Sequence, residues 1–133
     1  MNMTEDKKTI LIVEDEPALL KVYADGLTEA GFRVIRAKNG QEGMDVALRE
    51  KPAIILLDIL MPVMDGLTMM KKLREDHLWG KTVPIILLTN LSASEEEIMK
   101  AITKYEPAYY LVKSDYTLQG VLEKIQERLA RKV

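Results

Sequence analysis

The stretch Ala53-Ile-Ile-Leu-Leu-Asp58-Ile-Leu-Met-Pro62-Val-Met-Asp65-Gly66 carries a strand, a carboxylate and a turn in direct succession. Residues 53–57 form a continuous apolar run, which is typical of a strand buried on both faces of a parallel sheet. The run ends on the carboxylate of Asp58. Residues 61–66 have the proline, aspartate and glycine of a turn, and a helix is predicted to follow from about Leu67 to Asp76. The stretch therefore predicts a central strand that presents Asp58 at its carboxyl end.

The alternation of strand and helix continues on both sides of this stretch. Strands are predicted at residues 9–13, 32–37, 53–57, 83–88 and 109–112. Helices are predicted to begin near residues 17, 40, 67, 95 and 118, and Ser92 or Ser94 is the predicted cap of the fourth. Five β-α units in this order predict a doubly wound α/β domain, with a parallel sheet, helices on both faces and right-handed crossovers.

Four of the predicted strands are followed by a polar residue that could reach one crevice. These residues are Asp15, Asp58, Thr89 and Lys113. A single polar residue in a loop is most simply explained by solubility, but four at the carboxyl ends of parallel strands favour a functional crevice there.

The residue types at these strand ends suit phosphoryl transfer. Glu14, Asp15 and Asp58 would repel one another unless a cation lay among them, and hard oxygen ligands favour Mg²⁺. A carboxylate can accept a phosphoryl group as an aspartyl phosphate. Lys113 could then neutralise charge on the phosphoryl oxygens, and the Thr89 hydroxyl could donate a hydrogen bond.

Composition narrows the class of protein. The chain has 133 residues, 47% of them hydrophobic and 30% charged, which fits one globular domain. Its formal net charge of -2 lacks the broad basic field of nonspecific nucleic-acid binding, so we expect no direct contact with nucleic acid. The absence of cysteine excludes disulfides and thiolate catalysis. No apolar run approaches the roughly 20 residues of a membrane span, so we expect a cytoplasmic protein without membrane contact.

The sequence resembles the receiver domains of bacterial response regulators over about residues 8–131. The resemblance rests on four segments in a fixed order and spacing. They are Ile10-Leu-Ile-Val-Glu-Asp-Glu-Pro17, Leu56-Leu-Asp-Ile-Leu-Met-Pro62 with Asp65-Gly66, Ile85-Ile-Leu-Leu-Thr89, and Tyr110-Leu-Val-Lys113.

The resemblance implies a flavodoxin-like fold with strand order 2-1-3-4-5 and a chemistry centred on Asp58. That residue would accept a phosphoryl group from the phosphohistidine of a sensor histidine kinase or phosphotransfer protein. Mg²⁺ (or Mn²⁺) would be bound by Asp15, Asp58, water near Glu14 and the main-chain carbonyl of Leu60.

The resemblance also implies how the signal would leave the site. Thr89 and Tyr110 would act as switch residues that reshape the surface of the fourth helix, fifth strand and fifth helix for an unknown downstream protein. Lys113 would complete the catalytic set with Asp58 and Thr89. We expect a signalling domain rather than an enzyme, as a monomer or a phosphorylation-dependent dimer. Residues 8–131 are expected to form a single receiver domain, with residues 1–7 flexible and no output domain.

Three features depart from the family pattern. Ser114 follows Lys113 where proline after a cis peptide is usual, so the sequence leaves the geometry of this bond open. Asn90 replaces a small residue after Thr89. Leu60 and Leu91 are both apolar at positions whose side chains border the site in the family, and we predict that they restrict the attacking water and lengthen the phosphorylated lifetime.

Two other functions have to be weighed against the switch. Haloacid-dehalogenase-type phosphatases also use an aspartate nucleophile with magnesium, but they need a second aspartate two residues later, where this chain has Leu60. The stronger alternative is a pseudo-receiver, which would act as a phosphorylation-independent interaction module. Asp15, Asp58, Thr89 and Lys113 argue against it, while Asn90 and Ser114 leave it open.

Overall fold

The computed structural model of the chain describes residues 7–90 and 95–131. The elements in chain order are β1 (Thr9–Val13), α1 (Pro17–Glu29), β2 (Arg33–Ala37), α2 (Gly40–Glu50), β3 (Ile54–Asp58), α3 (Gly66–Asp76), β4 (Ile85–Thr89), α4 (Glu95–Tyr105), β5 (Tyr109–Val112) and α5 (Leu118–Ala130). Short 3₁₀ turns lie at Trp79–Lys81 and Lys113–Asp115. The predicted caps Ser92 and Ser94, the apolar Leu91 and all but the last residue of the segment 1–7, which was expected to be flexible, lie outside the described residues.

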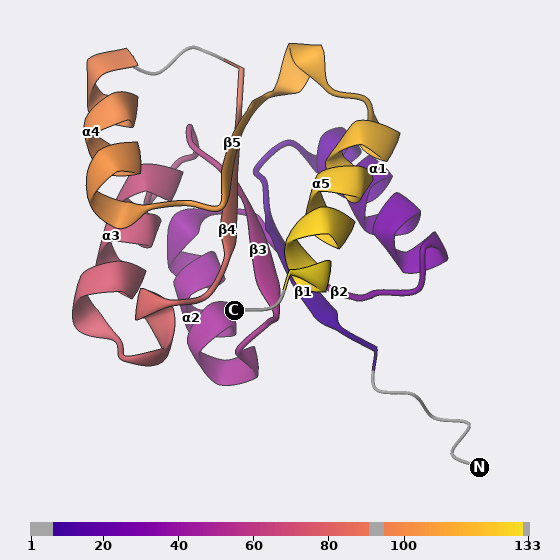
Figure 1. Cartoon of the computed structure of the whole chain (residues 1–133), viewed down its shortest axis with the longest axis horizontal. Coiled ribbons are helices and arrows are strands. Elements are labelled where there is room, and N and C mark those ends of the chain that lie inside the picture. Colours follow the sequence, from indigo (N-terminus) through magenta and orange to yellow (C-terminus); the bar gives the residue numbers. More distant parts are fainter. Residues whose placement is uncertain (1–6, 91–94, 132–133) are drawn as a thin grey trace.

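The strands form one parallel sheet in the order β2-β1-β3-β4-β5 (Figure 1). This arrangement confirms the predicted doubly wound α/β fold and its strand order. Val13 pairs with Leu57, Asp58 with Leu88, and Thr89 with Val112. The register therefore brings the carboxyl ends of β1, β3, β4 and β5 to the same edge of the sheet.

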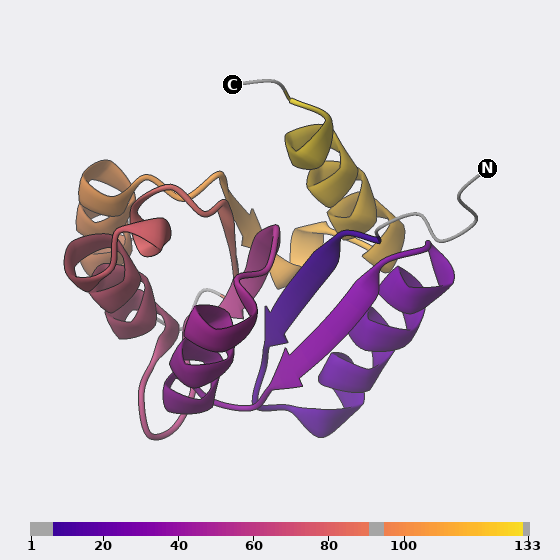
Figure 2. The same ribbon diagram turned by 90° about the horizontal axis from the view of Figure 1, so that it is seen from below.

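The sheet separates two hydrophobic cores because successive side chains of a strand point to opposite faces. Ile10 and Ile12 belong to the core that α1 and α5 cover. Leu11 and Val13 belong to the core that α2, α3 and α4 cover. Figure 2 shows the two groups of helices on opposite sides of the sheet. Burial on both faces explains why the central strands are continuously apolar in sequence.

Local chemistry explains where several helices begin. The backbone N–H of Glu42 donates to the side chain of Asn39 at 2.8 Å, and that of Thr68 donates to Asp65 at 2.8 Å. Thr117 caps α5 in the same way, by accepting from the N–H of Gly120 at 3.0 Å. These caps satisfy backbone donors that the first turn of a helix leaves without partners.

The predicted bounds were wrong by one or two residues at three strands. β2 begins at Arg33 rather than Phe32, and β3 spans 54–58, so Asp58 lies inside the strand rather than after it. β4 begins at Ile85 rather than Val83, because the Val83 carbonyl accepts a hydrogen bond from Arg74 and Pro84 has no N–H to donate.

None of the described helices is both long enough and apolar enough to span a lipid bilayer.

Candidate functional site

Three carboxylates meet at the carboxyl edge of the sheet. Glu14 and Asp15 follow β1, and Asp58 ends β3. Each of them places one carboxylate oxygen within 4.8 Å of the others. Glu14 and Asp58 are only 2% and 6% exposed, whereas Asp15 is open to solvent. The sequence prediction that these three residues form one cluster is therefore confirmed.

Lys113 brings a positive charge into this cluster from the turn that follows β5. Its Nζ lies 2.9 Å from Oε1 of Glu14 and 3.3 Å from Oδ2 of Asp58. The side chain of Lys113 is only 17% exposed, so water screens these ion pairs weakly. The described residues contain no cis peptide bond, so the Lys113–Ser114 bond is trans.

The pKa values of the cluster indicate that its negative charge is only partly compensated. Burial raises the pKa of Glu14 to about 7, with a further contribution from the Asp58 charge, although the hydrogen bond with Lys113 opposes the shift. Burial also raises the pKa of Asp58, against the attraction of Lys113. Burial alone would lower the pKa of Lys113, but the hydrogen bond with Glu14 and the charge of Asp58 raise it. One lysine thus faces three carboxylates, two of them buried.

A divalent cation fits this cluster. Carboxylate oxygens are hard ligands, and Mg²⁺ is normally held by one or two carboxylates together with water. The exposure of Asp15 leaves an open side for such waters. Glu14, Asp15 and Asp58 therefore form a group able to hold a metal ion.

The connection after β3 is fixed against the strand by Gly66. Its N–H donates to the carbonyl oxygen of Ile59 at 2.8 Å. A Cβ at this position would collide with the backbone carbonyl of Asp58, so only glycine allows the approach. This contact positions the loop that carries Leu60, whose carbonyl stays a predicted metal ligand.

The predicted switch residues occupy two different surroundings. Thr89 is fully buried at the end of β4, one residue beyond the Leu88 that pairs with Asp58. Tyr110 pairs with Leu87 in the register and packs partly buried against the core beneath α2, α3 and α4. Thr89 is therefore placed beside the acidic cluster, and Tyr110 lies deeper along the neighbouring strand. Asn90 is exposed.

Tyr23 is a neighbour of the site that sequence reasoning did not single out. It lies on α1 with 5% of its surface exposed, and the charges of Lys113, Glu14 and Asp58 all act on its hydroxyl. Burial raises the pKa of this tyrosine. In the sequence it is one more apolar position at helical spacing, and only the packing of α1 on the sheet brings it near the charges.

Comparison with known proteins identifies the class of domain. The family model of the response regulator receiver domain matches residues 10–126. The probable transcriptional regulator ycf27 of Porphyra purpurea is 36% identical over 104 residues, which cover 78% of this chain and 40% of that protein. The alkaline phosphatase synthesis transcriptional regulatory protein PhoP of Bacillus subtilis is 37% identical over 95 residues, which cover 71% of this chain and 37% of that protein.

A solved structure agrees over nearly the whole chain. The CheY-like response regulator receiver domain protein of Methanospirillum hungatei matches with a TM-score of 0.84 and 28% identity, covering 94% of this chain and 95% of that one. The chain spans about two fifths of the length of the two curated relatives, and both are named as regulators of transcription. The expectation that the protein makes no direct contact with nucleic acid is therefore not supported. From its sequence and its fold, the chain belongs to the response regulator receiver domain family of two-component signalling.

Proposed function

We propose that the chain is a phosphorylation-dependent switch in which Asp58 is the phosphoacceptor. The observation that carries the proposal is the pairing of the buried Asp58 carboxylate with Lys113 at 3.3 Å inside a cluster of carboxylates. A carboxylate so placed has a fixed orientation and a cation beside it, which are the two requirements of phosphoryl transfer that a protein can meet.

The donor would be the phosphohistidine of a sensor histidine kinase or phosphotransfer protein. An Oδ atom of Asp58 attacks the phosphorus, the P–N bond breaks, and the imidazole nitrogen leaves with the bonding electrons. Lys113 neutralises charge on the phosphoryl oxygens, and the buried hydroxyl of Thr89 donates a hydrogen bond to one of them. Each of these side chains acts from the end of a strand, so the sheet holds the set rigidly.

A bound Mg²⁺ (or Mn²⁺) would supply charge neutralisation at the phosphoryl oxygens. Glu14, Asp15, Asp58 and the Leu60 carbonyl would hold it. The burial of Glu14 and its hydrogen bond to the N–H of Glu16 at 3.2 Å support a role in orienting the metal's water ligands.

The phosphoryl group would bias a two-state surface. Lys113 now divides its charge between Glu14 and Asp58, and a phosphoryl group on Asp58 would compete for that charge. We propose that the response involves Thr89 and Tyr110 and changes the surface of α4, β5 and α5, where a downstream protein reads it. The domain spans residues 8–131 in this proposal.

The test is to incubate the protein with Mg²⁺ and acetyl phosphate and to measure its intact mass. We expect a gain of one phosphoryl group that requires Mg²⁺. Asp58→Asn, which keeps the size of the side chain, should gain nothing, whereas Asp45→Asn on the exposed face of α2 should behave as the wild type.

The opposite result has a definite meaning. If a folded protein gains no phosphoryl group from acetyl phosphate or from a cognate kinase, the switch is excluded and the pseudo-receiver takes its place.

A further inference from the structure

A groove of about 860 Å³ lies at the end of the sheet remote from Asp58. Pro84 and Ala108, the residues just before β4 and β5, form part of its floor. Its walls come from the carboxyl ends of α3, α4 and α5. Because Asp58 lies at the carboxyl ends of the strands, the groove is a separate site.

The groove is strongly basic. Its lining includes the basic residues Arg74, Lys81, Lys104, Arg128 and Arg131. Against them stand two carboxylates, Glu75 and Glu106. Basic side chains often serve to stabilise the carboxyl end of a helix, and three helices end here. Each helix end carries only about half a negative charge, so a surplus of more than one positive charge remains after all three are counted.

Arg74 is a fixed cation in the wall. Its Nε donates to the carbonyl of Tyr105 at 2.8 Å, and its Nη1 donates to those of Gly80 and Val83 at 2.7 Å each. Carbonyl dipoles hold the guanidinium in place without neutralising its charge. Within residues 7–90 and 95–131, no carboxylate lies at ion-pair distance from Arg74, Arg128 or Arg131.

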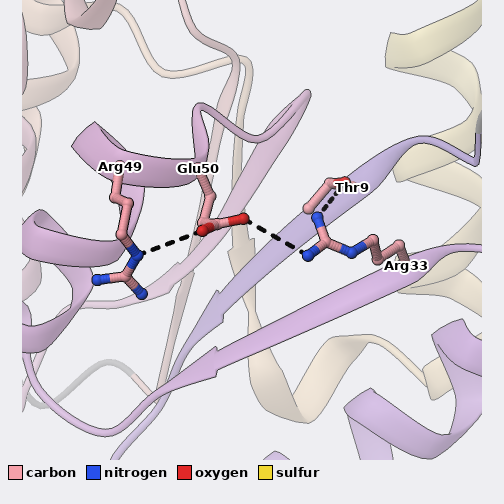
Figure 3. Close-up of polar contacts among 4 residues, drawn as sticks. All are labelled: Thr9, Arg33, Arg49 and Glu50. Atoms are coloured by element: carbon pink, nitrogen blue, oxygen red, sulfur yellow. Dashed lines mark hydrogen bonds and ion pairs between the residues drawn. The ribbon is translucent and has the colours of Figure 1, made fainter.

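Other arginines of the chain show the contrasting arrangement. Arg33 on β2 and Arg49 on α2 both form ion pairs with Glu50 (Figure 3). Nη2 of Arg33 lies 3.5 Å from Oε1 of Glu50, and Nε of Arg49 lies 3.2 Å from Oε2. Their charges are partly compensated by a carboxylate of the protein itself. Among the described residues, the arginines of the groove have no carboxylate at ion-pair distance, although the charge of Glu106 acts on Arg74 from further away.

We propose that this groove binds a phosphate-bearing small molecule of nucleotide size. Its volume lies within the roughly 300 to 1,000 Å³ of small-molecule sites, which favours a compact anion over an extended polymer. The apolar lining residues Pro84, Pro107 and Ala108 suit a flat ring, while the cations around them suit phosphates. Nothing in the proposal depends on Asp58 or on a metal.

The experiment is a titration of the full chain with ATP, followed by amide NMR shifts. Chelator is present, so that no metal-nucleotide complex reaches the acidic cluster. Tripolyphosphate, which lacks the base, and an Asp/Glu-rich peptide are titrated in parallel. The test variant is Arg128→Gln/Arg131→Gln, and the matched control is Arg33→Gln/Arg49→Gln, which removes the same charge from the cluster in Figure 3. Thermal melts establish that both variants are folded.

We expect saturable ATP-induced shifts confined to residues 81–84, 104–108 and 128–131. The test variant should weaken binding by roughly tenfold or more, and the control by far less. Tripolyphosphate should bind more weakly than ATP. The proposal is overturned by any of three results: shifts that do not saturate, equal weakening in the two variants, or tighter binding of the acidic peptide than of ATP.

Discussion

Leu60 lies two residues after Asp58 and keeps 42% of its surface exposed beside the acidic cluster. An apolar side chain there cannot orient a water molecule for attack on an aspartyl phosphate. We therefore expect Leu60→Asn to speed the loss of the phosphoryl group, measured as the decay of phosphorylated protein after the donor is removed. Val22→Asn, a change of the same kind on exposed α1, should leave the decay unchanged. An unchanged or slower decay in Leu60→Asn would contradict the idea.

Val63 is held in a backbone conformation that suits glycine. Its φ is 70°, and 82% of its surface is exposed, so packing does not offset the strain. A left-handed conformation costs an L-residue about 1 to 2 kcal/mol, and glycine would relieve this strain. Glycine also loses more backbone entropy on folding, which offsets roughly half of the relief. We expect Val63→Gly to raise the free energy of unfolding by about 0.5 to 1 kcal/mol in urea titrations. Val63→Ala, which keeps a Cβ, should gain less, and a loss of stability in Val63→Gly would show that the strain is absent.

At the scale of the elements, Arg74 joins two connections that are far apart in sequence. From the last turn of α3 it binds the carbonyls of Gly80 and Val83 before β4 and that of Tyr105 at the end of α4. We expect Arg74→Met to lower the free energy of unfolding by about 2 to 3 kcal/mol, because buried carbonyls lose a charged donor. Amide hydrogen exchange should accelerate at residues 80–85 and 105–108 before the rest of the chain. Arg49→Met, which removes an exposed arginine, should change stability little; similar losses in both variants would argue against this role.

The order and type of the elements could be predicted from sequence because strands buried on both faces leave an unmistakable apolar run. Residues 9–13 and 109–112 were predicted with their observed bounds. The start of β4 was not, because the bond that removes Val83 from the ladder comes from Arg74, nine residues earlier in the chain. The local sequence indicates that residues favour a strand, but it does not show that a side chain from another element binds the backbone and limits that strand.

The sequence predicted which residues form the candidate site better than it predicted which of them form ion pairs. Parallel strands bring their carboxyl ends together, so Glu14, Asp15, Asp58 and Lys113 could be placed in one crevice from the order of elements alone. That Lys113 lies closer to Glu14 than to Asp58 depends on the turn after β5 and has no local signature. The basic groove was missed for a similar reason. In the sequence each of its arginines is an ordinary basic residue near the carboxyl end of a helix, and only the fold brings the three helix ends together.

At the scale of the whole molecule, the acidic cluster should lower stability when no metal is bound. Burial raises the pKa of Asp58, which means that folding disfavours its ionised form at neutral pH. We therefore expect Asp58→Asn in chelator to be more stable than the wild type by about 1 kcal/mol in thermal or urea unfolding. Added Mg²⁺ should stabilise the wild type and have much less effect on the variant.

The exposed Asp45→Asn variant is the control for this prediction, and it should follow the wild type with and without Mg²⁺. A destabilised Asp58→Asn protein in chelator would mean that the pair with Lys113 contributes more than burial costs.

The division of the interior into two cores has a consequence for how this chain tolerates change. Buried side chains on opposite faces of the sheet belong to separate clusters, so substitutions beneath α1 and α5 should combine additively with those beneath α2, α3 and α4. Epistasis would then be confined to each side. During evolution the helices on one face could accumulate substitutions while those on the other face stay constant. The protein could then change its binding of one partner without altering its recognition of another.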